Sequence, residues 1–261
     1  MIDIHNHVLI DVDDGPGTTK DAIALIRQAV DDGITDIIAT PHHRNNYYDT
    51  PASVVTKKLN ELLTVLKNEK LNIEIHPGQE IRINGDLLQE LQSGKSLTLN
   101  DTQYVLLEFP FTGYPSYSET LFFDLQMAGY MPIIAHPERC KPFTQSSARL
   151  FDLIEKGAFA QLTASSVTGK MGKHLKKYSL KMIENNLIHL IASDAHEVTA
   201  RPFAIKEAYD VITSELGKEH TDRLKRNAEK ILNGNDFTTQ PPNKIDSLRL
   251  KNKNLFSKFF H

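Results

Sequence analysis

Six apolar runs, far apart in this sequence, each lead into an imidazole or carboxylate side chain. Five runs lead into Asp3-Ile4-His5-Asn6-His7, Thr40-Pro41-His42, Gly78-Gln79-Glu80, Ala135-His136-Pro137 and Ser193-Asp194-Ala195-His196, and the sixth leads into Glu108. A run of β-branched and aliphatic residues that stops at His, Asp or Glu indicates a buried strand that delivers a ligand to one end of a sheet. Mixed imidazole and carboxylate ligands suit borderline and hard divalent cations. The six runs together predict one shared metal site.

The spacing within these segments also fits shared ligands. His5 and His7 lie two positions apart, so both imidazoles point to the same face of a strand. Asp194 and His196 have the same spacing. Glu80 ends an apolar run, where an ionised carboxylate is costly unless it has a partner. Each residue alone also fits a core salt bridge or a surface position, but six unrelated explanations would then be needed, which favours the shared site.

The elements that must position these residues alternate along the chain. Strand-like runs span residues 2–7, 34–40, 73–81, 104–109, 131–136, 159–163 and 187–193. Helix-period segments span residues 18–32, 52–69, 117–128, 148–156, 173–185 and 202–216. This alternation predicts an α/β fold with parallel strands, and the candidate ligands lie at the carboxyl ends of the strands. Only a closed or distorted TIM-like barrel brings all those ends around one cavity.

Composition narrows the functional classes. The chain has 261 residues, 40% of them hydrophobic, and a net charge of -3, so no global feature favours nucleic acid. A single cysteine, Cys140, excludes an internal disulfide framework and suits a reducing cytoplasm. The sequence shows no secretory signal and no apolar stretch long enough to span a membrane. We therefore expect a cytoplasmic protein.

The last part of the chain has a different composition. A helix is expected over residues 220–233, and Pro241-Pro242 then separates a barrel domain, residues 1–240, from a basic and aromatic tail, residues 241–261. The tail contains Lys244, Arg249, Lys251, Lys253, Lys258, Leu255, Phe256, Phe259 and Phe260. Such a segment fits either a solubilising disordered end or a peripheral contact with the anionic inner face of a membrane.

The quoted residues resemble the motifs of a known superfamily. Asp3-x-His5-x-His7, Thr40-Pro41-His42-His43, Gly78-Gln79-Glu80-Ile81, Leu106-Leu107-Glu108, His136-Pro137-Glu138-Arg139 and Ser193-Asp194-Ala195-His196 are similar to motifs of the polymerase-and-histidinol-phosphatase (PHP) metal hydrolases. Within that superfamily, Asp11-x-Asp13-Asp14-Gly15-Pro16 and Gly78-Gln79-Glu80 resemble the bacterial capsule and exopolysaccharide tyrosine-protein phosphatases. The resemblance covers residues 1 to about 235.

The resemblance implies a distorted seven-stranded (β/α)7 barrel with up to three divalent ions. The first ion would be held by His5, His7, Glu80 and Asp194. The second would be held by Glu80, Glu108 and His136, and the third by Asp14, His42 and His196. In some superfamily members a histidine stands at the position of Asp14. Ligands of this kind admit manganese, iron, zinc or cobalt, and the resemblance points to manganese.

A metal site of this kind suits phosphomonoester hydrolysis without a protein nucleophile. Two ions about 3.5–4 Å apart share a hydroxide that attacks phosphorus. Cys140 lacks the Cys-x5-Arg loop of cysteine phosphatases and is interpreted as a small loop residue. Arg139 and Arg201 follow the ligands His136 and His196 closely, and we expect them to bind phosphate oxygens, although an arbitrary loop arginine is by default a surface charge.

Three functional hypotheses follow. The leading one is a manganese-dependent protein-tyrosine phosphatase that acts on an autophosphorylating bacterial tyrosine kinase controlling polysaccharide export. The second is a small-molecule phosphatase similar to histidinol-phosphate phosphatase, and the third is a non-catalytic metal-stabilised binding module. Tyr47, Tyr48 and residues 109–117 form either an aromatic rim for a phenyl phosphate or ordinary loop packing. An open aromatic rim favours a peptide substrate, and a deep closed pocket favours a metabolite.

Overall fold

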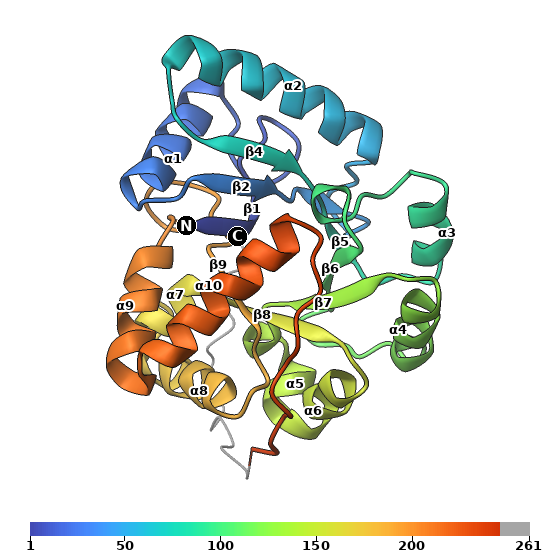
Figure 1. Cartoon of the computed structure of the whole chain (residues 1–261). Coiled ribbons are helices and arrows are strands. Elements are labelled where there is room, and N and C mark those ends of the chain that lie inside the picture. The colour runs from blue at the N-terminus through green and yellow to red at the C-terminus, as the bar shows by residue number, and fades with distance from the viewer. Residues whose placement is uncertain (246–261) are drawn as a thin grey trace.

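Parallel strands surrounded by helices form the centre of the computed structural model, which describes residues 1–245 (Figure 1). The strands are β1 (Ile2–Asn6), β2 (Asp36–Ala39), β3 (His42–His43), β4 (Glu74–Pro77), β5 (Glu80–Arg82), β6 (Tyr104–Glu108), β7 (Met131–Ala135), β8 (Phe159–Thr163) and β9 (Leu190–Ala192). The α-helices are α1 (Thr19–Asp31), α2 (Ala52–Glu69), α3 (Leu87–Gln92), α4 (Ser118–Met127), α5 (Lys141–Gln145), α6 (Ser147–Glu155), α7 (Ala164–Thr168), α8 (Lys173–Glu184), α9 (Ile205–Leu216) and α10 (Lys218–Leu232). Short 3₁₀ turns form η1 (Leu99–Asp101) and η2 (Pro137–Arg139).

Two strand positions are each divided into two short strands, which distorts the barrel. Run 34–40 contains β2, and β3 follows just beyond its end, whereas run 73–81 is itself broken into β4 and β5. The first members of each pair lie in a sheet of order β1-β2-β4, and the second members lie in a sheet of order β3-β5-β6-β7-β8-β9. The break between β4 and β5 contains Gly78, where a Cβ atom would lie 2.7 Å from Cγ2 of Ile38. Only glycine therefore fits where the chain crosses from one sheet to the other.

The barrel closes between its first and last strands. The amide of Asp194 donates to the carbonyl of His5 at 2.8 Å, and the amide of His7 donates to the carbonyl of Ala195 at 2.8 Å. With β2–β3 and β4–β5 each counted as one position, seven strand positions surround the interior. The predicted distorted (β/α)7 barrel is therefore confirmed.

Side-chain alternation separates an interior core from an outer one. On β6, Tyr104 and Leu106 face the interior cluster, whereas Val105 and Leu107 pack outward against the helices. Glu108 takes the next inward position on the same strand. Ala228 and Ile231 of α10 belong to the interior cluster, and α10 crosses one end of the barrel (Figure 1). The interior is thus filled with apolar side chains below the ligands.

An irregularity in the pairing of β1 with β2 sets the direction of the His5 side chain. The pairing with β2 advances by three residues on β1, from Asp3 to Asn6, but by only two on β2, from Ile37 to Ala39. Strict alternation would place neighbouring residues of β1 on opposite faces. The extra residue changes that order, as bulges beside active sites do. Ile4 therefore packs in the interior cluster while His5 turns to the ligand end of the barrel.

Most helix boundaries agree with the periodicity of the sequence. Helix α1 begins after Thr18, whose hydroxyl accepts from the amide of Asp21 at 3.2 Å, and α10 begins slightly earlier than expected. The short helices α3, α5 and α7 have no clear apolar period and were not anticipated. Residues 241–245 run back over the barrel, where the amide of Asn243 donates to the carbonyl of Asn185 at 2.9 Å. The remainder of the predicted tail, 246–261, lies outside the described residues.

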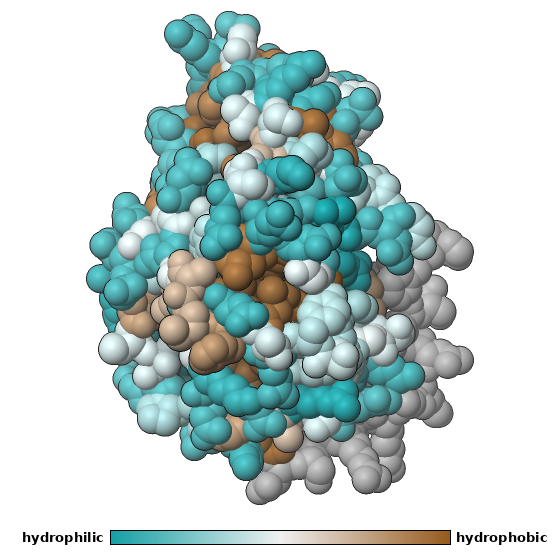
Figure 2. Space-filling view, turned by 90° about the vertical axis from the view of Figure 1, so that its right-hand side faces the viewer, coloured by the Kyte–Doolittle hydropathy of each residue, from teal (hydrophilic) through white to brown (hydrophobic). Residues whose placement is uncertain are grey.

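The outer surface of the helical layer is mainly polar. The face in Figure 2, which is the right-hand side of Figure 1, is largely hydrophilic with an apolar area near its middle. Phe123 and Met127, both on α4, have exposed fractions of 60% and 73%. Among residues 1–245, no helix combines the length and apolar character that a membrane crossing requires.

Candidate metal centre

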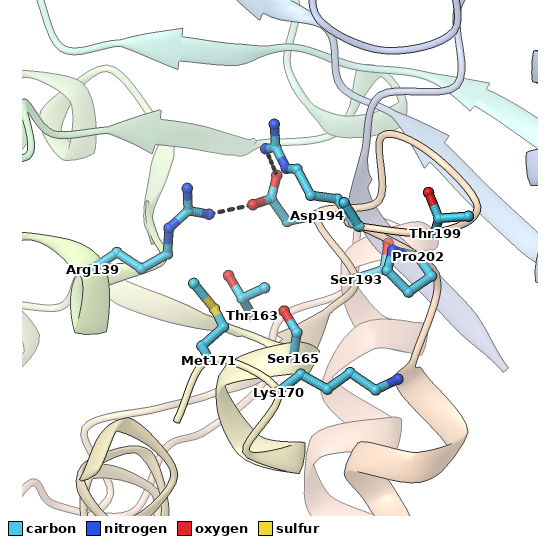
Figure 3. A pocket seen from close by; sticks show the side chains of 11 residues that line it. Arg139, Thr163, Ser165, Lys170, Met171, Ser193, Asp194, Thr199 and Pro202 are labelled. Carbon is cyan, nitrogen blue, oxygen red and sulfur yellow. Dashed lines mark hydrogen bonds and ion pairs between the residues drawn. The ribbon is translucent and has the colours of Figure 1, made fainter. Parts of the chain in front are cut away.

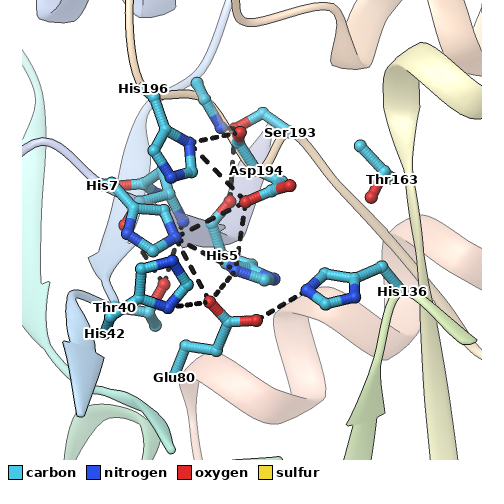
Figure 4. Close-up of polar contacts among 12 residues, drawn as sticks. His5, His7, Thr40, His42, Glu80, His136, Thr163, Ser193, Asp194 and His196 are labelled. Atoms are coloured by element: carbon cyan, nitrogen blue, oxygen red, sulfur yellow. Dashed lines mark hydrogen bonds and ion pairs between the residues drawn. The ribbon is translucent and has the colours of Figure 1, made fainter. Parts of the chain in front are cut away.

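The ligand ends of the strands meet at one end of the barrel, and all nine predicted ligands lie there. Their sources are β1 or its end for His5 and His7, the following loop for Asp14, β3 for His42, β5 for Glu80, β6 for Glu108, the end of β7 for His136, and the loop after β9 for Asp194 and His196. Figure 4 shows the imidazoles of His5, His7 and His42 arranged around Glu80, with His136 on its other side.

One group of ligand atoms forms a nearly equilateral triangle. Nε2 of His5, Nε2 of His7 and Oε2 of Glu80 are each 3.4 Å from the other two. Ligands bonded at 2.0–2.1 Å in a tetrahedral site are separated by about 3.4 Å. Oδ1 of Asp194 lies 3.4 Å from Nε2 of His5 and 3.5 Å from Nε2 of His7. The donor atoms predicted for the first ion therefore converge.

Two further groups of potential ligands overlap with the first. One contains His7, Asp14, His42 and His196, and the other contains His42, Glu80 and Glu108. The ligands predicted for the third ion, Asp14, His42 and His196, therefore lie together, and His7 joins them. The group around Glu80 and Glu108 differs from the set predicted for the second ion, because it contains His42 in place of His136. His136 instead places Nε2 2.6 Å from Oε1 of Glu80.

Two of the predicted ligands have unusual backbone conformations. His136 has φ of 32° and Asp194 has φ of 53°, both in the left-handed region that non-glycine residues seldom adopt. Such conformations cost about 1–3 kcal/mol each and persist where the surrounding structure fixes them. His136 directly follows the end of β7, and Asp194 lies two residues beyond the end of β9, so both occupy the turn where the chain leaves a strand at the ligand end of the barrel.

Three residues that were not predicted as site residues orient the ligands. Oδ2 of Asp13 lies 2.6 Å from Nδ1 of His7 and also accepts from the amide of His42 at 3.0 Å. Oε1 of Gln161 lies 2.9 Å from Nδ1 of His5. With their Nδ1 atoms engaged in this way, both histidines present Nε2 to the site. Gln161 interrupts the apolar run of β8 at an inward position. A polar side chain in such a run could have identified Gln161 as a site residue from the sequence.

The third orienting residue is Asp3, which ties the first strand to the last. Its carboxylate accepts from the amide of Ser193 at 3.0 Å and from the hydroxyl of Ser193 at 2.5 Å. Burial raises the pKa of Asp3 to about 6, although the hydrogen bonds from Ser193 oppose this shift. Asp3 therefore fixes the strand end that carries Asp194.

The surroundings of Glu80 favour its ionised form, and those of His136 favour its neutral form. Burial alone would raise the pKa of Glu80, but His5, His42 and His136 outweigh it and hold that pKa well below its usual value. Burial and Arg139 lower the pKa of His136 to about 4. Neutral imidazole and ionised carboxylate are the protonation states that metal coordination requires.

The remaining ionisable ligands are shifted by burial and by one another. Burial, followed by His7 and Arg201, lowers the pKa of His196 to about 4. Burial and the nearby charge of Glu80 raise the pKa of Glu108. Burial lowers the pKa of His5, but Glu80 and Asp194 outweigh it and raise that pKa. A divalent cation among these groups would stabilise the ionised carboxylates and displace the imidazole protons.

Arg139 and Arg201 line a pocket of about 290 Å³ beside the ligands (Figure 3). Arg139 donates from Nη1 to Oδ2 of Asp194, and Arg201 donates from Nη1 to Oδ2 of Asp14 at 2.7 Å. Thr163 and Ser165 contribute hydroxyl groups to the pocket. Two guanidinium groups with nearby hydroxyls suit a phosphoryl group.

The profile of the family described as capsular polysaccharide synthesis, CpsB/CapC, matches residues 1–233. The chain belongs to the CpsB/CapC family.

Named relatives in the CpsB/CapC family extend over nearly the whole chain. The chain is 45% identical over 250 residues to the tyrosine-protein phosphatase YwqE of Bacillus subtilis, covering 96% of this chain and 98% of that protein. It is 43% identical over 242 residues to the putative tyrosine-protein phosphatase CapC of Staphylococcus aureus, covering 93% of this chain and 95% of that protein.

A solved structure extends the CpsB/CapC comparison to three dimensions. A crystal structure from work on YwqE of Bacillus subtilis and CpsB of Streptococcus pneumoniae, described as unique metal-dependent tyrosine phosphatases, matches with a TM-score of 0.92 at 45% identity, covering 95% of this chain and all of that one. A probable 2-pyrone-4,6-dicarboxylic acid hydrolase of Acinetobacter baumannii matches with a TM-score of 0.52 at 12% identity, covering 89% of this chain and 98% of that one, which shows likeness of fold alone.

Aromatic residues of this CpsB/CapC family member divide between the site and the core. The ring of Tyr48 stacks on His42 with centroids 6.1 Å apart, and the ring of Phe111 stacks on His136 at 5.9 Å. Tyr114 instead packs against Phe109 and the surrounding core. The predicted rim therefore consists of a few rings beside the ligands.

Cys140 is fully buried beneath this rim, and burial raises the pKa of its thiol. Its Sγ atom lies 3.8 Å from the carbonyl oxygen of Phe109. A buried thiol that stays protonated is unreactive, which agrees with the interpretation of Cys140 as a small residue without a catalytic role.

Proposed function

We propose that this protein is a manganese-dependent protein-tyrosine phosphatase. The observation that carries the proposal is the set of overlapping ligand groups around Glu80, next to a pocket with two arginines. The names of its relatives support a phosphotyrosine substrate, and the description of the matching crystal structure supports a metal requirement. Manganese in particular rests on the mixed nitrogen and oxygen ligands and on the PHP resemblance.

The residues present fit divalent cations. Oε2 of Glu80 is buried and accepts no hydrogen bond, although three imidazole nitrogens lie within 3.4 Å of it. We assign His5, His7, Glu80 and Asp194 to one ion, Glu80 and Glu108 with His136 to a second, and Asp14, His42 and His196 to a third. His42 also reaches the second group. When bound, such ions supply an activated water and neutralise charge on the phosphoryl group.

The chain's own residues would bind and orient the substrate. Arg139 and Arg201 place guanidinium donors in the pocket and would contact the phosphoryl oxygens. Asp13 and Gln161 would keep His7 and His5 in the tautomer that presents Nε2. Tyr48 and Phe111 would contact the phenyl ring of the substrate.

The proposed protein substrate is an autophosphorylating bacterial tyrosine kinase that controls capsule or exopolysaccharide synthesis. The family description, which refers to capsular polysaccharide synthesis, supports this partner. A cytoplasmic location agrees with a kinase that displays its phosphotyrosines inside the cell. Peripheral membrane contact through the tail, residues 241–261, stays a prediction, because residues 246–261 lie outside the part of the chain that the structure describes.

One experiment separates this proposal from its alternatives. Metal-stripped protein is loaded with manganese, iron, zinc or cobalt, and turnover is measured with phosphotyrosine peptides and with histidinol phosphate. We expect the highest kcat/KM for phosphotyrosine peptides in the manganese form. Preference for histidinol phosphate would support a metabolite phosphatase. Tight metal binding without turnover of either substrate would support a metal-stabilised binding module.

A further inference from the structure

Helix α8 carries positive charge that its own stability does not explain. Lys173, Lys177 and Lys181, which we call the α8 ridge, are spaced four residues apart and therefore lie along one face. Like charges at this spacing destabilise a helix, and cations in the first turn oppose the helix dipole. The first turn of α8 contains no acidic residue, although it contains Lys173. Lys181 lies in the last turn, where a cation suits the dipole, but the repulsion between the ridge lysines and the position of Lys173 oppose local stability, which is typical of functional positions.

The lysines of the α8 ridge have no carboxylate partner in the described part of the chain. Within residues 1–245, none of the three lies within ion-pair distance of a carboxylate, whereas neighbouring Lys170 pairs with Glu207 at 2.9 Å and Lys176 pairs with Glu215 at 3.5 Å. The net charge of the whole chain is -3, so this concentration of lysines departs from the average surface. Among the described residues, the ridge is therefore a cationic surface without ion-pair partners on an acidic protein.

A groove runs along the ridge, close in sequence to the arginine pocket. It has a volume of about 420 Å³ and is lined by the ridge lysines, Lys176, Leu180 and Glu184 of α8 and by Glu215 and Leu216 of α9. Four lysines thus face two carboxylates there, and Glu215 is already paired with Lys176. The loop between α7 and α8 contributes Lys170 and Met171 to the wall of the pocket that holds Arg139 and Arg201. The two hollows thus adjoin the same short segment, residues 170–173, and α8 lies next to α9 (Figure 1). A chain leaving the pocket along this loop would meet the ridge.

We propose that the α8 ridge binds an acidic segment of polypeptide next to the phosphotyrosine of a protein substrate, an inference that rests on the proposed phosphatase activity. Lys173 and Lys181 are separated by about 12 Å along the helix axis. An extended peptide spans that length with about four residues. Carboxylates or further phosphates on those residues would pair with the lysines, and Leu180 and Leu216 would contact their aliphatic parts. The ridge would select substrates by the charge of their flanking sequence.

The test compares peptides that differ only in their flanks. Manganese-loaded protein is assayed with a phosphotyrosine peptide carrying a run of glutamates, on either side of the phosphotyrosine in separate peptides, with matched glutamine peptides, and with p-nitrophenyl phosphate. The test variant is Lys173→Gln/Lys177→Gln/Lys181→Gln. The matched control is Lys57→Gln/Lys67→Gln/Lys70→Gln, which removes the same charge at and beyond α2.

For one of the two glutamate peptides, the ridge variant should raise KM about tenfold at low salt, as expected for the loss of several exposed ion pairs, with kcat unchanged. The effect should shrink in high salt. Glutamine peptides, p-nitrophenyl phosphate and the control variant should change less than about twofold. Equal changes for glutamate and glutamine peptides, or no change for either, would overturn the proposal.

Two further measurements keep this inference separate from the proposed activity. Fluorescence anisotropy of a labelled glutamate peptide measures binding without turnover. If the wild type binds the peptide through the ridge lysines but hydrolyses no phosphotyrosine, the proposed activity fails and the docking surface stands. Co-sedimentation with phosphatidylserine vesicles tests another anionic partner. Ridge-dependent vesicle binding without any flank effect would assign the ridge to a membrane and overturn the peptide proposal.

Discussion

Arg139 donates a hydrogen bond to Oδ2 of Asp194, while Oδ1 of the same carboxylate faces His5 and His7. Arg201 and Asp14 repeat the arrangement, because Oδ2 of Asp14 accepts from Arg201 and Oδ1 lies 3.2 Å from Nε2 of His196. Each arginine therefore donates a hydrogen bond to the carboxylate of a predicted metal ligand and also lines the pocket proposed for the phosphoryl group. From the sequence, the two arginines were expected to contact only the phosphate oxygens of the substrate.

This arrangement predicts that Arg139→Gln lowers metal affinity as well as turnover. Loss of a group that orients a ligand typically weakens metal binding about 10–100-fold. Loss of a donor to the phosphoryl group should lower kcat on the order of a hundredfold. Elemental analysis after dialysis against graded metal buffers, with kcat at saturating manganese, measures both. Arg149→Gln is the control, since Arg149 lies over the ring of Tyr114. Unchanged metal affinity would leave Arg139 with a substrate contact alone.

Glu80→Gln should remove metal from more than one position of the centre. Glu80 belongs to two of the ligand groups and contacts His136 as well. The amide keeps the size of the side chain but loses the charge and one acceptor oxygen, so at least two ions would be affected. Metal content by mass spectrometry should fall by more than one ion per chain relative to the wild type. A loss confined to one ion would show that Glu80 does not bridge.

Asp13→Asn should weaken metal binding although Asp13 is not a proposed ligand. The carboxylate of Asp13 fixes the tautomer of His7 and also accepts from the backbone amide of His42. The side chain of asparagine has only one acceptor oxygen, so one of these two contacts would be weaker. We expect metal affinity to fall about 10–100-fold. Titration calorimetry with manganese gives the measurement, and Asp11→Asn in the same loop is the control. Equal affinities in the two variants would argue against an orienting role.

Chelation should abolish turnover, whereas Cys140→Ser should leave turnover nearly intact. The thiol is buried and its pKa is raised by burial, so it offers no nucleophile. Turnover of p-nitrophenyl phosphate is followed after metal stripping and again after manganese addition, with metal content checked by elemental analysis. Activity that persists without metal would contradict the mechanism.

His189 should make the protein less stable in acid, independently of the metal centre. Burial, followed by the charge of Arg223, lowers the pKa of His189 from 6.5 to about 3. Between these pH values the unfolded chain binds a proton that the folded chain does not, so stability falls as the pH decreases by up to about 1.4 kcal/mol per pH unit. Urea unfolding from pH 7 to pH 4 should show a shallower dependence for His189→Gln than for the wild type. His174→Gln, at an exposed position, should keep the wild-type slope.

The sequence was most informative where one local rule governed the outcome. The apolar run 104–109 predicted a buried strand that delivers Glu108 to the shared site. Local pattern did not predict that run 73–81 would break, because the close approach of Gly78 to Ile38 is a contact between separate strands. The ion pair of Arg139 with Asp194 was missed for the same reason. Contacts across the barrel mouth depend on side-chain directions that no spacing along the chain reveals.

The closure of β1 against the end of β9 has a consequence for biosynthesis. Asp3 and Ser193, which hold that seam together, are separated by 190 residues. Bringing such distant residues together is slow, because chain entropy is lost before the contact contributes. During synthesis His5 and His7 leave the ribosome first, but Asp194 and His196 must follow before the ligand set is complete. A chain truncated before β9 therefore carries most of the barrel without a complete metal centre, so metal uptake distinguishes finished molecules from incomplete ones.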